Sequence, residues 1–98
     1  MDNPPSFSGG DAALMQYIKD NLKYPTIAQE QGIQGRVVVK FVVNRDGSIS
    51  DIQVQKSLDP NCDKEAIRLI KSMLNWIPGK QNGKNVATYY SLPVLFRI

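Results

Sequence analysis

Hydrophobic and polar residues alternate through the last ten residues of this chain, 89–98. The residues of one parity are all apolar or aromatic: Tyr90, Leu92, Val94, Phe96 and Ile98. A period of two indicates a strand with one buried face. Pro93 lies within the run and has no N–H, which predicts an edge strand with the proline nitrogen turned away from its partner, or a bulge. An apolar edge either stays without a partner or docks an extended segment of another chain, and we interpret this one as a docking surface.

The strongest strand signal spans residues 36–44 and predicts the middle of a sheet. One of its faces is wholly apolar and the other is half-apolar, which is typical of a central strand. Residues 44–47 supply a turn, with Gly47 free to adopt a positive φ. A second strand, residues 48–56, returns with Ile52 and Val54 facing inward. Ile49 has the opposite parity, so we expect a bulge or a loop residue there.

Helical spacing of apolar residues marks the N-terminal part of the chain. Asp11 is the expected N-cap of a first helix, and its apolar stripe is Leu14, Met15, Ile18 and Leu22. Pro25 ends this helix because the residue before a proline avoids the helical region. The same proline opens a short helix, residues 26–31, which Gly32 closes.

A third helix is predicted between the second and the last strand. Its apolar stripe is Cys62, Ala66, Leu69, Ile70, Met73, Leu74 and Ile77. Asn61 or Asp63 is the expected N-cap, and Pro78-Gly79 the stop. Trp76 follows the stripe and is expected in the core, as is the small side chain of Cys62. Residues 80–85 are expected to form a polar loop around Gly83.

The order of these elements restricts the topology. A right-handed crossover through the third helix brings the last strand against the first strand from its free side. We therefore predict an α+β fold, a two-layer sandwich with a three-stranded antiparallel sheet in the order 2-1-3. The two main helices cover one face of this sheet. The last strand then lies at an edge, where Pro93 places it independently.

Length and composition allow one domain of ordinary globular character. The chain has 98 residues, is 42% hydrophobic and 21% charged, and carries a net charge of +3. This weakly basic balance is insufficient to predict nucleic-acid binding. We expect residues 1–10, with Pro4-Pro5, to be the remnant of a linker and residues 11–98 to be the domain. We expect no membrane-spanning segment within these residues, and no signal peptide is visible in them.

The residue inventory argues against an enzyme. Histidine is absent and cysteine occurs once, which removes the commonest general base and leaves no metal-ligand spacing. Nearly all of the nine carboxylates fall at caps, turns or solvated helix faces, where local structure explains them. We therefore predict no catalytic residues, no metal and no cofactor.

Several short motifs, taken in order and spacing, resemble the C-terminal domain of TonB proteins. The resemblance runs from about Asp11 to the last residue. It is carried by Lys23-Tyr24-Pro25, Ala28, Gly32, Gly35-Arg36-Val37-Val38-Val39, Phe41-Val42-Val43, Asp46-Gly47, Ile52-Gln53-Val54, Ala66, Trp76, Pro78-Gly79-Lys80 and Leu95-Phe96-Arg97-Ile98. The Trp-x-Pro-Gly-Lys segment and the helix before Tyr24-Pro25 are most similar to the versions of Bacteroidetes-type bacteria.

The resemblance implies the periplasmic end of an energy transducer anchored in the inner membrane. In that family a motor of the ExbB and ExbD type acts on TonB, here through an N-terminal region outside this sequence. The C-terminal domain binds the TonB box, an extended segment of an outer-membrane transporter, by pairing it with the last strand. The implied contact residues are Lys23, Tyr24, Pro25, Tyr89, Ser91, Pro93, Leu95 and Arg97, with Lys23 where many relatives carry glutamine.

Other interpretations stay open on the sequence alone. Tyr24 could be a core aromatic against the first helix instead of a peptide contact. Similar domains also occur fused to membrane-embedded sensor zinc peptidases, where this domain would be an interaction module. The exposed edge strand further predicts pairing of two copies into a homodimer at high concentration.

Overall fold

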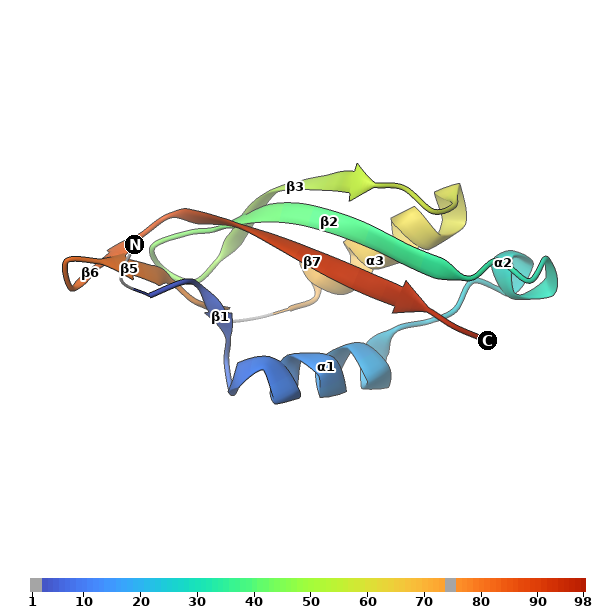
Figure 1. Cartoon of the computed structure of the whole chain (residues 1–98), viewed down its shortest axis with the longest axis horizontal. Helices are drawn as coiled ribbons and strands as arrows, with labels where there is room; N and C mark the ends of the chain where they lie inside the picture. The colour runs from blue at the N-terminus through green and yellow to red at the C-terminus, as the bar shows by residue number, and fades with distance from the viewer. Residues whose placement is uncertain (1–2, 74–75) are drawn as a thin grey trace.

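The computed structural model describes residues 3–73 and 76–98. Three helices and a central three-stranded sheet form its main body, with four shorter strands at one end (Figure 1). In chain order the elements are β1 (Ser6–Phe7), α1 (Gly10–Asn21), α2 (Thr26–Glu30), β2 (Gly35–Val43), β3 (Ile49–Lys56), α3 (Pro60–Lys71), β4 (Trp76–Ile77), β5 (Gly79–Gln81), β6 (Lys84–Val86) and β7 (Thr88–Phe96). The sheet has the order β3-β2-β7 with antiparallel pairing throughout, as predicted.

The core lies between one face of this sheet and helices α1 and α3, which both cover that face (Figure 1). The sheet contributes alternate residues of β2 and β7, because side chains two apart in a strand share a face. These are Val37, Val39, Phe41, Val43, Leu92, Val94 and Phe96, all buried. Leu14 and Ile18 of α1 and Cys62, Ala66, Leu69 and Ile70 of α3 pack against them. The predicted two-layer α+β sandwich is confirmed.

Trp76 joins the N-terminal segment to the core. Its ring contacts those of Phe7, Phe41 and Tyr90, with centroids 5.0–5.4 Å apart. Strand β1 pairs with β4, so that Phe7 lies opposite Trp76 and is itself 8% exposed. Asn3 also forms an antiparallel bridge with Lys80, through two backbone hydrogen bonds of 3.2 and 2.9 Å. The N-terminal segment is thus paired with the rest of the molecule from Asn3 to Phe7. The core position predicted for Trp76 is confirmed.

The caps of the two long helices differ from those expected. Helix α1 begins at Gly10 after Gly9, so Asp11 lies in its first turn and not at the N-cap. The N-cap of α3 is Asp59, which accepts hydrogen bonds from the N–H groups of Asn61 (3.0 Å) and Cys62 (3.3 Å). Pro60 occupies the first helical position, where its missing N–H costs nothing. Asn61 and Asp63 were thus wrong as caps.

Helix α3 ends at Lys71, earlier than its apolar stripe predicted. Ser72 follows as C-cap, and its hydroxyl donates to the Leu69 carbonyl at 2.6 Å. Trp76 and Ile77 lie in strand β4, and Ile77 is 47% exposed and not part of a helical stripe. The predicted helical position of Leu74 lies outside the described residues. The expected polar loop 80–85 is instead a hairpin, β5 and β6, whose turn is Asn82-Gly83 with positive φ at both residues.

Candidate binding site

One edge of the central sheet, formed by β7, is regular and is paired with another described strand on one side only. Strand β7 pairs with β2 in unbroken register over nine positions, from Gly35 opposite Phe96 to Val43 opposite Thr88. Pro93 lies opposite Val38 and fits the ladder only where its nitrogen faces away from β2. Residues two apart share that orientation, so the N–H and C=O groups of Tyr89, Ser91 and Leu95 face the open edge. No other strand of the described residues pairs with this side of β7.

The opposite edge of the sheet is irregular. Strand β3 carries an extra residue relative to β2 at two places, near Asp51 and near Gln55. Asp51 has φ 51°, which is unusual for a residue other than glycine and fits the bulge that Ile49 predicted. Bulges of this kind protect an edge from pairing with another chain. The sheet therefore offers β7, and not β3, to an added strand.

We call the unpaired backbone edge of β7, at Tyr89, Ser91, Pro93 and Leu95, the docking edge. The side chains along it that point away from the helices lie on what we call the open face of the sheet. Tyr89 is 63% and Leu95 45% exposed. The Nζ atom of Lys40 lies 4.3 Å from the centroid of the Tyr89 ring. The hydroxyl of Ser91 donates to the side-chain oxygen of Gln55 at 3.0 Å. This face is thus a mixture of exposed apolar and basic groups.

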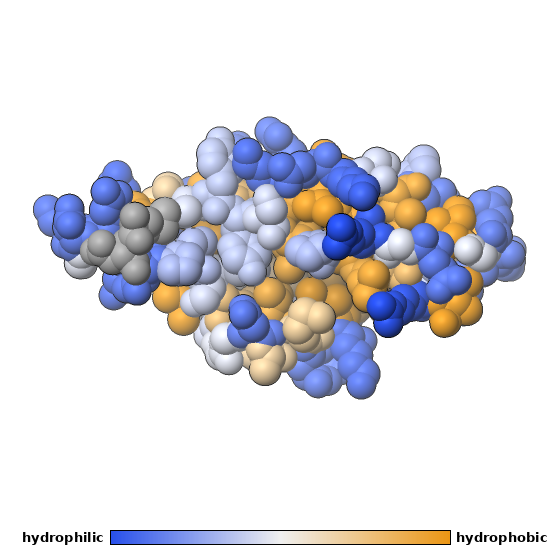
Figure 2. Space-filling model, viewed as in Figure 1, coloured by the Kyte–Doolittle hydropathy of each residue, from blue (hydrophilic) through white to orange (hydrophobic). Residues whose placement is uncertain are grey.

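A groove runs between β7 and α1, directly below the docking edge. Figure 2 shows hydrophobic surface in this part of the molecule, and the cavity has a volume of about 400 Å³. We call it the helix groove; it is lined by Asp11, Leu14, Met15, Arg36, Tyr90, Leu92, Pro93 and Leu95. Burial, and next the charge of Asp11, raises the pKa of the Tyr90 phenol. An extended chain added to β7 would lie along this groove.

The predicted contact residues fall into two separate groups. Tyr89, Ser91, Pro93 and Leu95 lie together on β7, and the exposed Arg97 follows the end of the strand. By contrast, Lys23, Tyr24 and Pro25 connect α1 to α2 and line a different cavity, against α3. The two cavities share no residue.

The side chain of Tyr24 makes its described contacts with residues of the domain itself. Its ring meets that of Phe96 edge-on at a centroid distance of 5.5 Å, and its hydroxyl donates to the Ile33 carbonyl. Burial, and to a lesser degree Cys62, raises the pKa of its phenol. The core reading of Tyr24 therefore has direct structural support, while its contact with a peptide stays a prediction.

Glu65 and Arg68 of α3 hold the segment that contains Tyr24. Glu65 accepts from the Lys23 N–H at 2.7 Å and from two nitrogens of Arg68 at 2.6 and 2.8 Å. Arg68 also donates to the Asn21 carbonyl at 2.9 Å, where α1 ends. Burial raises the pKa of Glu65, but hydrogen bonds from Arg68 and the Lys23 N–H outweigh it and bring that pKa below its usual value.

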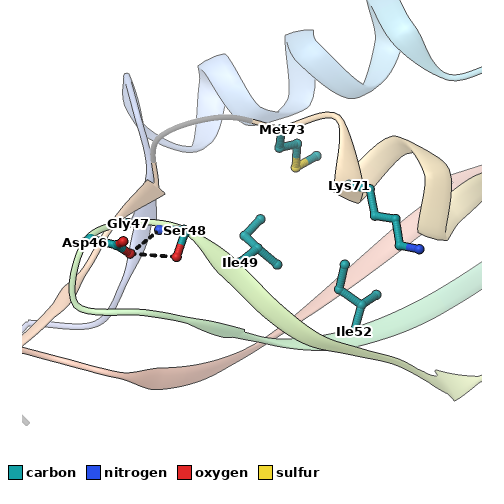
Figure 3. A pocket seen from close by; sticks show the side chains of 7 residues that line it. All are labelled: Asp46, Gly47, Ser48, Ile49, Ile52, Lys71 and Met73. Atoms are coloured by element: carbon teal, nitrogen blue, oxygen red, sulfur yellow. Dashed lines mark hydrogen bonds between the residues drawn. The ribbon is translucent and has the colours of Figure 1, made fainter.

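A third cavity, of about 370 Å³, lies between β3 and the end of α3 (Figure 3). Ile49, Ile52 and Met73 form its apolar part. Asp46 accepts from the Ser48 hydroxyl at 2.6 Å and its N–H at 3.0 Å, which lowers the pKa of the Asp46 carboxyl. Lys71 points away from Asp46 (Figure 3). These groups stabilise the turn and assemble no acid–base pair.

In the described part of the chain, no three histidine, cysteine or carboxylate residues gather where they could hold a metal ion. Cys62 is fully buried, as predicted, and burial together with the nearby Asp59 and Asp63 raises the pKa of its thiol. None of the described helices is both long and apolar enough to cross a membrane. The features that remain as candidates for binding are the backbone edge of β7 and the apolar side chains beside it.

Comparison with known proteins identifies the family. Residues 20–98 match the family model described as Gram-negative bacterial TonB protein C-terminal. The chain belongs to this family. Protein TonB of Pseudomonas aeruginosa is 34% identical over 94 residues, which cover 96% of this chain and 28% of that protein. Protein TonB of Helicobacter pylori is 40% identical over 62 residues, which cover 62% of this chain and 22% of that protein.

Solved structures of TonB C-terminal domains have the same fold. A solution structure from H. pylori gives a TM-score of 0.69 at 29% identity and covers 88% of this chain and 90% of that one. The P. aeruginosa domain gives 0.62 at 36% identity, with 81% and 80% covered. Membership of this TonB family confirms both the predicted resemblance and the expectation that the domain is not an enzyme. The chain spans only about a quarter of the length of these TonB relatives.

The helix groove was not found by sequence reasoning. The helical spacing predicts Met15 in the apolar stripe of the first helix, but its side chain is 61% exposed and lines the groove. A signal was present, because its neighbours one helical turn away, Asp11 and Lys19, are both charged. An apolar residue in an otherwise charged row of a helix indicates surface rather than core.

Proposed function

We propose that this chain is the periplasmic C-terminal domain of a TonB-type energy transducer. It binds the TonB box, an extended segment of an outer-membrane transporter, by adding that segment to the sheet at β7. The observation that carries the proposal is the regular, open edge of β7, in a chain that belongs to the TonB family. The TonB relatives give no support to the alternative of a module fused to a sensor peptidase.

The proton gradient is coupled to transport because the transducer is attached to the motor at one end and to the transporter at the other. Upstream of this domain, a segment anchored in the inner membrane connects it to an ExbB/ExbD-type motor, which draws on the proton gradient. The added strand transmits force to the transporter, because pulling along a paired strand loads several backbone hydrogen bonds together. The regular ladder between β7 and β2 passes that load into the centre of the sheet.

Strand pairing alone gives little affinity. Each backbone hydrogen bond contributes a net stabilisation of about 0.5–1.5 kcal/mol. Ordering each residue of a flexible peptide costs about 1–2 kcal/mol, so the two terms nearly cancel. Side chains beside the strand must supply the remainder, and we expect an isolated peptide to bind in the micromolar range. Tethering within the cell envelope raises the effective concentration.

A titration of the ¹⁵N-labelled domain tests this proposal. The probe is a synthetic peptide from the N-terminal segment of an outer-membrane transporter of the same organism, and a scrambled peptide of equal composition is the control. We expect saturable amide shifts at Tyr89, Ser91 and Leu95, whose N–H groups face the docking edge. Shifts confined to Lys23 and Tyr24 would move the site to the α1–α2 connection. No shifts at millimolar peptide would overturn the proposal.

A further inference from the structure

Helix α1 contributes a wall to the docking site although it lies almost entirely outside the matched family region. The family model begins at residue 20, whereas α1 spans Gly10–Asn21. Its residues Leu14 and Met15 line the helix groove together with β7. The helix is fixed in place, because Ile18 is buried in the core and the Tyr17 hydroxyl bonds Ser72 beyond the end of α3.

The two faces of an added strand would meet different surroundings. Side chains alternate between the faces of a sheet, so every second residue of the ligand points to the α1 side. There it meets two side chains of α1 that line the helix groove, the exposed Met15 and the buried Leu14. The other residues lie on the open face, where Lys40 of β2 supplies positive charge next to Tyr89. Arg36, opposite Leu95, adds a second positive charge where this face meets the helix groove.

We propose that α1 determines which segments bind at the docking edge, and that Met15 does so by contacting the ligand residues on the helix side. It accepts an extended transporter segment whose helix-side residues are apolar and whose open-face residues are polar or acidic. This inference rests on the proposed strand addition at β7 and names the chemistry of the segment that the site takes. A thioether suits the role, because methionine adapts its shape to different apolar partners.

Exchanging Met15 for glutamate places a charge in the groove without disturbing the core, since this side chain is 61% exposed. Ile27→Glu is the matched control: Ile27 is 56% exposed, lies on α2 and does not line the helix groove. The probes are a transporter-derived peptide and a series in which each position in turn is lysine. Dissociation constants are measured by the ¹⁵N titration, and circular dichroism verifies that both variants are folded.

We expect Met15→Glu to weaken the parent peptide about tenfold or more, and Ile27→Glu to leave it within about twofold. In the wild type, lysine should weaken binding at the alternate positions on the helix side that face Met15, whereas a helix-side position next to Asp11 and Tyr90 should tolerate lysine. On Met15→Glu, lysine at one of these positions should restore affinity, which a general loss of stability would not produce.

The outcomes separate this inference from the function on which it rests. If Met15→Glu binds like the wild type while the Ser91 and Leu95 amides still shift, strand addition stands and the role of α1 is overturned. If the dissociation constants of the lysine-substituted peptides do not alternate with position, the proposed role of Met15 is overturned as well. If the wild type binds no peptide of the series, both proposals are wrong.

Discussion

The ring of Tyr24 packs edge-on against that of Phe96, at a centroid distance of 5.5 Å. Phe96 is the last residue of β7 and is fully buried. The segment between α1 and α2 thus packs against the core face of β7, the strand whose backbone edge is open. A substitution of Tyr24 can therefore change binding without any contact between this residue and a ligand.

Tyr24→Ala should lower the free energy of unfolding by about 2–3 kcal/mol, because it removes an aromatic ring from a half-buried site next to Phe96. Tyr24→Phe keeps the ring and leaves the Ile33 carbonyl without its donor, so its expected cost is about 1 kcal/mol. Urea unfolding followed by circular dichroism measures both. If Tyr24→Ala weakens peptide binding at unchanged stability, Tyr24 is a ligand contact and not a support.

Gly47 has a close neighbour that leaves no room for a side chain. It has φ +86°, and a Cβ atom there would lie 2.3 Å from the Trp76 carbonyl oxygen. The backbone N–H of Trp76 donates to the Gly47 carbonyl at 3.1 Å, which fixes the two segments together. We expect Gly47→Ala to lower the unfolding free energy by more than 2 kcal/mol, roughly the sum of conformational strain and steric overlap.

Gly83→Ala is the control for this substitution. Gly83 has φ +76°, but no atom lies within 4 Å of its would-be Cβ. It carries the conformational strain without the overlap, so its cost should be about 1 kcal/mol. Equal effects at both positions in chemical denaturation would show that the contact with Trp76 does not matter.

The central sheet was predictable because its strands carry strong alternation. Residues of one parity in β2 and β7 face a single core, and Pro93 leaves β7 only an edge position. The β5–β6 hairpin was also signalled, by Asn82-Gly83, but the polar residues around it masked the pattern. For these elements, local sequence and tertiary structure agree.

Other features depend on partners that are distant in sequence. The apolar stripe of α3 does not reveal that the chain leaves the helix after Lys71 to pair Trp76 with Phe7. The family resemblance implied a ligand contact for Tyr24, and the residues alone left open a core position against the first helix. Neither showed that its ring packs against Phe96 of β7. The helix groove arises only when α1 packs against β7, which no local pattern encodes.

Acidification should loosen the junction between α1, α2 and α3. The pKa of Glu65 is lower in the folded domain than in the unfolded chain, because Arg68 and the Lys23 N–H stabilise its carboxylate. Glu65 therefore adds stability above its unfolded pKa, and this contribution disappears as the pH falls through the folded value. Urea unfolding between pH 7 and pH 3 should show this loss for the wild type.

Glu65→Gln isolates the effect, because the amide cannot ionise and still accepts hydrogen bonds. Its stability should be lower at pH 7 and should decline less below about pH 4.5. Wild type and variant should converge at low pH. Parallel curves over the whole range would show that the charge of Glu65 does not stabilise the junction.

The docking edge can be closed by removing one N–H group. The N–H of Ser91 faces away from β2, so Ser91→Pro should leave the β2–β7 ladder intact, as Pro93 already does two residues further on. It should weaken peptide binding at least about tenfold, since a ligand carbonyl loses its donor and meets the proline ring. Ser91→Ala also loses the hydrogen bond to Gln55 but keeps the N–H, and should bind within about twofold of the wild type. Equal affinities for Ser91→Pro and Ser91→Ala, with both folded by circular dichroism, would show that ligands do not pair with this part of β7.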